Sequence, residues 1–265
     1  MKSKIASTII LSASALTAEA RPLEVVGTGD GMELVRAVGA AFTAEHPDRI
    51  VLVPPSIGSG GGIAAVGAGK ALLARVARPL KPAEKETGLV SRSIFRLPTA
   101  IYVNAELKIG ALSYSDLVAI YEGRITNWNV VGGPDLRIKV VRREDTDSSL
   151  TVLKKTMPGW ATLDITSRSK TALTTQDAVE TVKEVRGGIG FGPFSRVLEN
   201  SVRVLSIGGL YPTDSLYPSF VTISYVWRKG SYPGSVRAFV EYGRSKKARA
   251  LLAAHGAVPI ELGER

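Results

Sequence analysis

The feature that most constrains the fold is a unit in which an apolar run, a loop of small or hydroxyl residues and a helical pattern follow one another. The unit occurs three times, with loops at residues 27–31, 55–62 and 142–149. Short apolar runs that alternate with helical patterns indicate buried strands connected by helices. The sequence therefore predicts an α/β fold.

The same patterns predict the other elements of the chain. Strands are expected at 23–26, 50–53, 72–76, 100–104, 138–141, 189–191 and 221–226. Helices are expected at 32–44, 62–66, 113–121, 150–155, 178–185, 235–242 and 246–255. Ser113 and Thr175 are suitable N-caps for two of these helices, because a hydroxyl can accept from a free helical N–H.

The first twenty residues have the pattern of a secretory signal. Lys2 and Lys4 precede a stretch of apolar and small residues, and Ala18-Glu19-Ala20 provides the small-x-small cleavage pattern. We expect residues 1–20 to be a signal peptide that is cleaved before Arg21. No cysteine is present to carry a lipid anchor, so the product is expected in the periplasm without one.

Composition excludes several classes of protein and site. The chain has 265 residues, 45% of them hydrophobic, with no cysteine and two histidines. A disordered chain, a zinc site of the cysteine type and a histidine-based catalytic relay are therefore not expected. The net charge is +10, but the densest basic run, residues 244–249, contains no aromatic residue for base stacking. We expect no nucleic-acid partner, no cofactor and no metal.

The three loops have the chemistry of an anion site. A helix start exposes unpaired N–H groups and the positive end of the helix dipole, and glycine allows an anion to approach closely. Arg142 can supply a full positive charge. Asp30 fits an N-cap as well as a ligand contact, and Thr146 and Ser148 also fit simple caps.

Motifs of competing functions are incomplete. Gly69-Lys70 is followed by alanine, which breaks the P-loop pattern. Ser59 lacks the glycine two positions earlier that a nucleophile elbow requires. An exported hydrolase therefore remains a third alternative only, and we do not expect an enzyme.

At these loops the sequence resembles the phosphate-specific periplasmic binding proteins of ABC transporters. The similar segments, spread over nearly the whole chain after residue 20, are VVGTGDG, PPSIGSGGGI, VARPLKPAE, YEGRITNWNVVGG, IKVVRREDTDSS, RGGIGFGPF and VRAFVEYGRSKKARALLAAHGAVPI. The resemblance implies the two-lobed type II periplasmic-binding-protein fold, in which each lobe is a mixed sheet flanked by helices. It places residues 21–101 and 193–265 in lobe one and 102–192 in lobe two, with the ligand cleft between them.

The resemblance also implies the ligand-binding positions. Gly31 and Met32 would offer backbone N–H groups, with Asp30 beside them, and Ser59 and Gly60 would form the second loop. Arg142 would pair with the anion and Glu144 would support that arginine. The remaining positions are those that cap the following helix: Thr146, Asp147 and Ser148.

The chain departs from the family pattern where an aspartate is usual. The family sequence G-A-S-D corresponds to Ala74, Arg75, Val76 and Ala77. A carboxylate acceptor distinguishes protonated phosphate from sulfate, which carries no proton at neutral pH. Asp147, Asp30 or Glu144 could restore this acceptor, while Arg78 would favour a more fully ionised anion or have a structural role.

We therefore expect a monomeric periplasmic protein that binds phosphate, or a related oxyanion, and delivers it to an ABC transporter permease. The alternative is an anion-sensing or interaction module with the same fold and no transport role. The sequence leaves open the choice between phosphate and sulfate.

Overall fold

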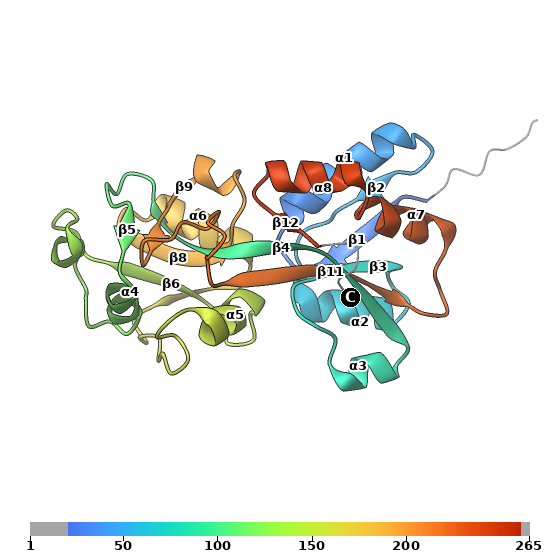
Figure 1. The fold of residues 1–265 in the computed structure, drawn as a ribbon. Coiled ribbons are helices and arrows are strands. Elements are labelled where there is room, and N and C mark those ends of the chain that lie inside the picture. Colours follow the sequence, from blue (N-terminus) through green and yellow to red (C-terminus); the bar gives the residue numbers. More distant parts are fainter. Residues whose placement is uncertain (1–20, 261–265) are drawn as a thin grey trace, which may run out of the picture.

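The computed structural model describes residues 21–260, which form two lobes joined by two long strands (Figure 1). The predicted signal peptide lies outside the described residues. No helix in the described part of the chain is long and apolar enough to cross a membrane.

Lobe one contains both ends of the described chain. Its strands are β1 (Leu23–Gly27), β2 (Val51–Leu52), β3 (Leu73–Val76), the first part of β4 (Leu89–Asn104), β11 (Phe220–Arg228) and β12 (Val258–Pro259). Its helices are α1 (Met32–Glu45), α2 (Gly58–Gly67), α3 (Pro82–Glu86), α7 (Gly234–Tyr242) and α8 (Lys246–Ala254). The sheet order is β2-β1-β3-β11-β4. Strand β1 is parallel to both β2 and β3, whereas β11 is antiparallel to both β3 and β4.

Lobe two is built on the second part of β4. Its strands are β5 (Ala111–Leu112), β6 (Lys139–Arg143), β7 (Lys170–Ala172), β8 (Gly188–Pro193), β9 (Val202–Val204) and β10 (Ser206–Ile207). Its helices are α4 (Tyr114–Tyr121), α5 (Ser148–Thr156) and α6 (Thr175–Glu184), with short 3-10 turns at Trp128–Val131 and Leu198–Asn200. The sheet continues in the order β4-β8-β6-β7.

The chain crosses between the lobes in β4 and β11. β4 pairs with β11 as far as Pro98 and then with β8 from Thr99 onward, so one strand belongs to both sheets. The resemblance implied a return to lobe one at residue 193, but the return crossing lies at the start of β11. The segment before β11 packs in lobe two, because Phe194, Leu205 and Tyr217 belong to the apolar clusters of that lobe. Lobe two thus extends well beyond the expected boundary at residue 192.

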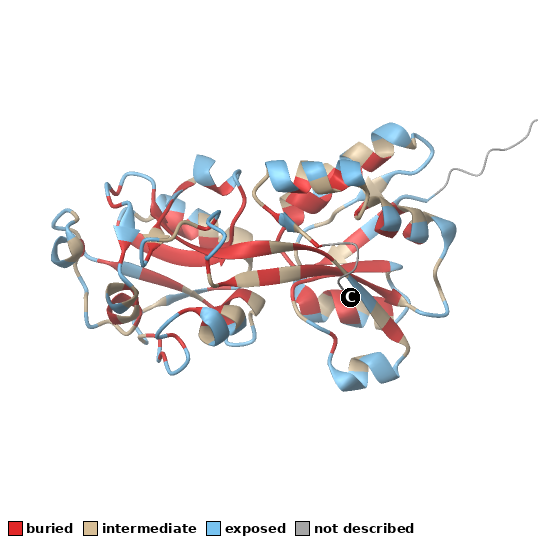
Figure 2. Cartoon of the chain, viewed as in Figure 1, coloured by how far each residue is buried: buried red, intermediate tan, exposed pale blue. Residues whose placement is uncertain are grey.

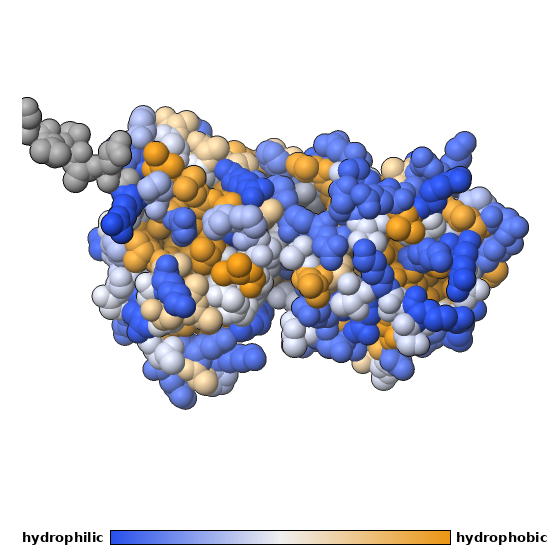
Figure 3. All heavy atoms as spheres, turned by 180° about the vertical axis from the view of Figure 1, so that it is seen from behind, coloured by the Kyte–Doolittle hydropathy of each residue, from blue (hydrophilic) through white to orange (hydrophobic). Residues whose placement is uncertain are grey.

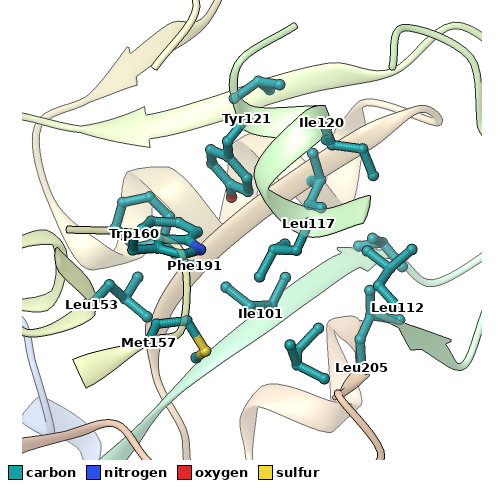
Figure 4. Packing of buried hydrophobic residues seen from close by; sticks show 14 of the residues in the cluster. Ile101, Leu112, Leu117, Ile120, Tyr121, Leu153, Met157, Trp160, Phe191 and Leu205 are labelled. Atoms are coloured by element: carbon teal, nitrogen blue, oxygen red, sulfur yellow. The ribbon is translucent and has the colours of Figure 1, made fainter. Parts of the chain in front are cut away.

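Each lobe has its own apolar core. In lobe two, Tyr121, Trp160 and Phe191 pack with ring centroids 4.9–5.9 Å apart (Figure 4). In lobe one, Val35, Val38 and Phe42 are buried at helical spacing along α1. Burial follows the shared strands through the junction of the lobes (Figure 2). Two cores joined by two strands make hinge bending the motion that disturbs the least packing.

Most predicted elements are present, and the differences have local causes. Ser113 caps α4 as expected, but Thr174 rather than Thr175 caps α6. The helix α2 begins at Gly58, four residues before the expected start. Its first turn consists mainly of glycine and serine, which do not indicate a helix in the sequence. β4 begins at Leu89 although only 100–104 was expected, since its first part contains the polar run Ser91-Arg92-Ser93 and the proline Pro98, which do not indicate a strand.

Candidate functional site

The three glycine- or hydroxyl-rich loops meet where the lobes face each other. The first two loops touch in lobe one, where Ile57 N–H donates to the Gly27 carbonyl at 3.0 Å. The third loop ends at Asp147, whose charge acts on Asp30 of the first loop. A fourth helix start, that of α6, joins them through Thr175. The predicted convergence of helix N-termini is thus present, with α6 in addition.

Asp30 is the centre of this region. Its side chain is buried, and its Oδ1 accepts a hydrogen bond of 2.6 Å from the Thr175 hydroxyl of the opposite lobe. Burial and the nearby negative charge of Asp147 raise the pKa of Asp30 to about 7, although the Thr175 hydrogen bond and the positive charge of Arg143 act to lower it. The carboxyl group therefore exchanges a proton near neutral pH.

Arg143 is the arginine that faces Asp30 across the cleft. Its Nε and Nη2 both donate to Asp147 Oδ2, at 3.2 and 2.8 Å, and both side chains of this ion pair are about 10% exposed or less. Asp147 Oδ1 accepts from the Leu150 N–H at 3.1 Å and so caps α5. Asp147 thus holds both Arg143 and the helix start.

Three buried polar atoms of this region have no partner: Asp30 Oδ2, Arg143 Nη1 and Ser149 Oγ. They come from both lobes and comprise an acceptor, a charged donor and a hydroxyl. An unpartnered buried polar atom costs about 1–3 kcal/mol, and more when it is charged. A small oxyanion that carries one proton has the complementary groups, since it accepts from arginine and serine and donates to a carboxylate.

Arg142, the expected anion partner, points elsewhere. Its Nε donates to the Arg143 carbonyl at 3.1 Å, and its Nη2 pairs with the exposed Asp145. Neighbouring residues of a strand point to opposite faces, so only one of the two arginines of β6 can face the cleft. The structure gives this place to Arg143, and we replace Arg142 by Arg143 in the proposed site.

Two other expected side chains also lie away from the cleft. Arg78 forms a bidentate pair with Glu84 of α3, at 2.7 and 2.8 Å, so its guanidinium is committed within lobe one. Glu144 is exposed and does not support the arginine of the site. Arg143 is instead held by Asp147. Thr146 is exposed, while Ser148 is half-buried as the first residue of α5.

The expected residues of the first two loops lie at helix starts. Gly31 has φ 65°, a left-handed conformation that favours glycine, and it precedes α1. Met32 N–H donates to the Gly29 carbonyl at 3.2 Å, so this amide is used within the loop. Ser59 Oγ accepts from Ala77 N–H at 3.1 Å, which leaves its own proton free to donate. Gly60 lies in the first turn of α2, where the space beside its Cα is open.

The lobes are closed over this region. Gln176 of α6 donates to the Gly29 carbonyl at 3.1 Å, and Val152 of α5 packs against the core of lobe one. A notch at the lower edge of the surface view marks the boundary between the lobes (Figure 3). A groove of about 200 Å³ between α1 and α6 lies beside the site and is lined by Leu34, Val179 and Phe194 among others, but not by Arg143 or Asp147.

Comparison with known proteins identifies the family. A family model described as the PBP superfamily domain matches residues 12–247. The chain belongs to the PBP superfamily. Its resemblance to the substrate-binding proteins of phosphate transporters is confirmed by relatives of that name.

Among the relatives of this PBP chain is the phosphate-binding protein PstS of Bacillus subtilis. It is 26% identical over 251 residues, which cover 90% of this chain and 80% of the relative. A Clostridium perfringens substrate-binding protein whose crystal structure contains phosphate has a TM-score of 0.80 at 23% identity, covering 91% of this chain and 100% of the other. An ABC-type phosphate transport receptor from Vibrio cholerae has a TM-score of 0.64 at 21% identity, covering 90% and 100%. These structures confirm the two-lobed α/β fold.

Sequence reasoning missed three residues that the PBP fold brings to this site: Arg143, Ser149 and Thr175. Arg143 and Ser149 each stand one position after a residue that was chosen, Arg142 and Ser148. The sequence therefore indicated the right segment but not which of its side chains face the cleft. Thr175 was taken only as a helix cap. Its contact with Asp30 spans 145 positions of sequence and has no local signature.

The raised pKa of Asp30 predicts how the stability of this PBP chain depends on pH. The folded value of about 7 exceeds the ordinary 3.8, so the folded state binds the proton more tightly than the unfolded chain. The contribution of Asp30 to the free energy of unfolding is fully present below about pH 4 and is lost as the pH rises to about 7. We expect Asp30→Asn, which cannot ionise, to melt several degrees above the parent at pH 8 without phosphate.

Melting curves of parent and variant between pH 4 and pH 8 measure this effect. The difference should be small at pH 4 and should grow with pH. An equal melting temperature at pH 8 would contradict the raised pKa.

Proposed function

We propose that this protein binds inorganic phosphate between its two lobes, outside the cytoplasm, and delivers it to the permease of an ABC transporter. Binding and release involve no chemical step, so the protein acts as a carrier. The proposal extends to this chain what the printed names of its relatives say of those proteins. The signal-like residues 1–20 support export.

The observation that carries the proposal is the set of unpartnered atoms Asp30 Oδ2, Arg143 Nη1 and Ser149 Oγ. Phosphate with one proton would donate to Asp30 and accept from Arg143 and Ser149. Asp30 would thereby take over the acceptor role of the aspartate that Ala77 replaces. Asp30 suits this role better than Glu144, which is exposed, or Asp147, which already accepts from Arg143 and Leu150.

The free-energy gain is sufficient for a transport protein. Hydrogen bonds to charged groups contribute about 1.5–3 kcal/mol each, and micromolar affinity requires about 8 kcal/mol. Three such bonds, together with the dipoles of the helices that start at the site, reach that range. We expect Ser59 and the backbone of the first two loops to add further donors.

Calorimetric titration of the purified protein tests the proposal. Phosphate should bind at micromolar concentration or below at pH 8, whereas sulfate at millimolar concentration should give no saturable heat. Absence of binding with either anion would reject the transport function, and preference for sulfate would reject the choice of ligand. Light scattering in the same buffer tests the expected monomer.

A sensing module that binds the same anion is the second candidate. It is favoured by the two carboxylates, Asp30 and Asp147, which face a single arginine and give the empty site a negative charge at high pH. Reconstitution with the permease of the same genome distinguishes the two: a carrier stimulates ATP hydrolysis by the permease in the presence of phosphate, and a sensor does not.

A further inference from the structure

We propose that Arg75 is a positioning residue of the anion site, which fixes the first two loops and places a buried positive charge behind them. The inference rests on the proposed function. Arg75 lies in β3 and is 0% exposed. A buried strand normally carries apolar residues, so a guanidinium here requires an explanation.

Within residues 21–260, the guanidinium bonds only to backbone carbonyls. Nε donates to the Thr28 carbonyl at 2.7 Å, Nη2 donates to the Pro54 carbonyl at 2.9 Å, and Nη1 donates to the Val25 carbonyl. Among the described residues, no carboxylate lies within ion-pair distance of Arg75. A buried charge without a counter-charge is costly, and part of that cost is offset when an anion binds nearby.

The Thr28 and Pro54 carbonyls belong to the segments that lead into α1 and α2, whereas the Val25 carbonyl belongs to strand β1. A planar trans peptide points its carbonyl and the following N–H in opposite directions. When the Thr28 carbonyl is held toward Arg75, the Gly29 N–H is turned away from it. Gly29, like Asp30, touches lobe two, since Gln176 donates to its carbonyl. Arg75 thus orients the first loop toward the cleft and ties it to the second.

The charge on Arg75 persists at neutral pH. Burial and the nearby positive charge of Arg36 lower the pKa of Arg75 to about 10, while Glu33 and Tyr225 act in the opposite direction. The guanidinium is therefore ionised in the pH range where phosphate binds. Its Nε contacts the carbonyl of Thr28, so this positive charge lies directly behind the first loop.

The test compares Arg75→Met, Arg75→Lys and a matched control, Arg78→Met. Methionine keeps an unbranched side chain but removes the charge and all three hydrogen bonds. Lysine keeps the charge but cannot reproduce the planar fork that holds two loops. Arg78→Met removes an arginine three positions away whose guanidinium pairs with Glu84 outside the cleft.

Two measurements are made on each folded protein. Hydrogen exchange without ligand reports the two loops, and calorimetry reports phosphate affinity. We expect Arg75→Met to exchange faster at residues 27–31 and 56–58 and to bind phosphate at least 10-fold more weakly. Arg75→Lys should lie between parent and Arg75→Met, and Arg78→Met should bind within 2-fold of the parent.

Unchanged exchange in the loops, or phosphate affinity within 2-fold of the parent, would overturn the role of Arg75 while leaving the proposed function intact. A parent that binds no phosphate would contradict the proposed function itself and this role with it. If Arg75→Met does not fold, Arg75→Lys decides, and parental affinity in that variant would overturn the proposal.

Discussion

Replacement of Arg143 by methionine is expected to weaken phosphate binding at least 100-fold. The variant loses a charge-assisted hydrogen bond to the anion, which contributes about 1.5–3 kcal/mol. It also leaves Asp147 without its partner, so two buried carboxylates then repel the ligand. Calorimetry at pH 8 measures the change, and circular dichroism checks that the variant is folded.

The neighbouring arginine provides a matched control. Arg142→Met removes the same charge from the same strand, but its guanidinium pairs with the exposed Asp145 and not with the site. We expect the affinity of Arg142→Met to stay within about 2-fold of the parent, because exposed ion pairs contribute about 0–1 kcal/mol. A large loss in Arg142→Met together with a small loss in Arg143→Met would show that the assignment of the two arginines is reversed.

Replacement of Asp30 by asparagine is expected to weaken the preference for phosphate over sulfate. An ionised carboxylate accepts the phosphate proton and repels sulfate, whereas an amide can donate to either anion. We expect phosphate affinity to fall about 10-fold or more and saturable sulfate binding to appear. Competition between the two anions, measured at pH 8, gives the ratio directly.

The same reasoning predicts that discrimination between phosphate and sulfate depends on pH in the unmodified protein. Below pH 7 Asp30 becomes neutral and can donate to sulfate, so discrimination should decrease as the pH falls through about 7. In Asp30→Asn the ratio of affinities should not change across this range, apart from the protonation of phosphate itself. Constant discrimination in the parent between pH 5 and pH 8 would contradict the role of Asp30 as the acceptor.

Asp30→Ala tests whether the carboxylate instead blocks the site. If Asp30 occupied the place of the ligand, its removal would open space beside Arg143 and strengthen anion binding. If it accepts the ligand proton, the removal weakens phosphate binding. Stronger phosphate binding in Asp30→Ala would therefore reject our account of the site.

Much of this architecture was predictable because its signals are local. The glycine and hydroxyl residues at the starts of helices, and the apolar spacing of α1, are patterns that can be recognised from neighbouring residues in the sequence. The lobe boundary was not predictable in the same way. The segment before β11 packs in lobe two through Leu205 and Tyr217, and these contacts depend on the tertiary fold rather than on composition.

The site shows a similar division. The sequence indicated an arginine-led loop that begins a helix, but a strand of alternating faces decides which of Arg142 and Arg143 enters the cleft. That choice depends on the pairing of β6 with β7 and β8. Likewise, the sequence left open whether Asp30 caps a helix or contacts a ligand. Its hydrogen bond with Thr175 of the other lobe places it at the interface, and this bond has no signal in the sequence.

A crystal structure of the protein grown with phosphate tests the central claim most directly. We predict one tetrahedral anion between the lobes, within hydrogen-bond distance of Asp30 Oδ2, Arg143 Nη1 and Ser149 Oγ. An anion bound away from these atoms, or a closed site in which Arg143 bonds directly to Asp30 with no anion between them, would contradict the account.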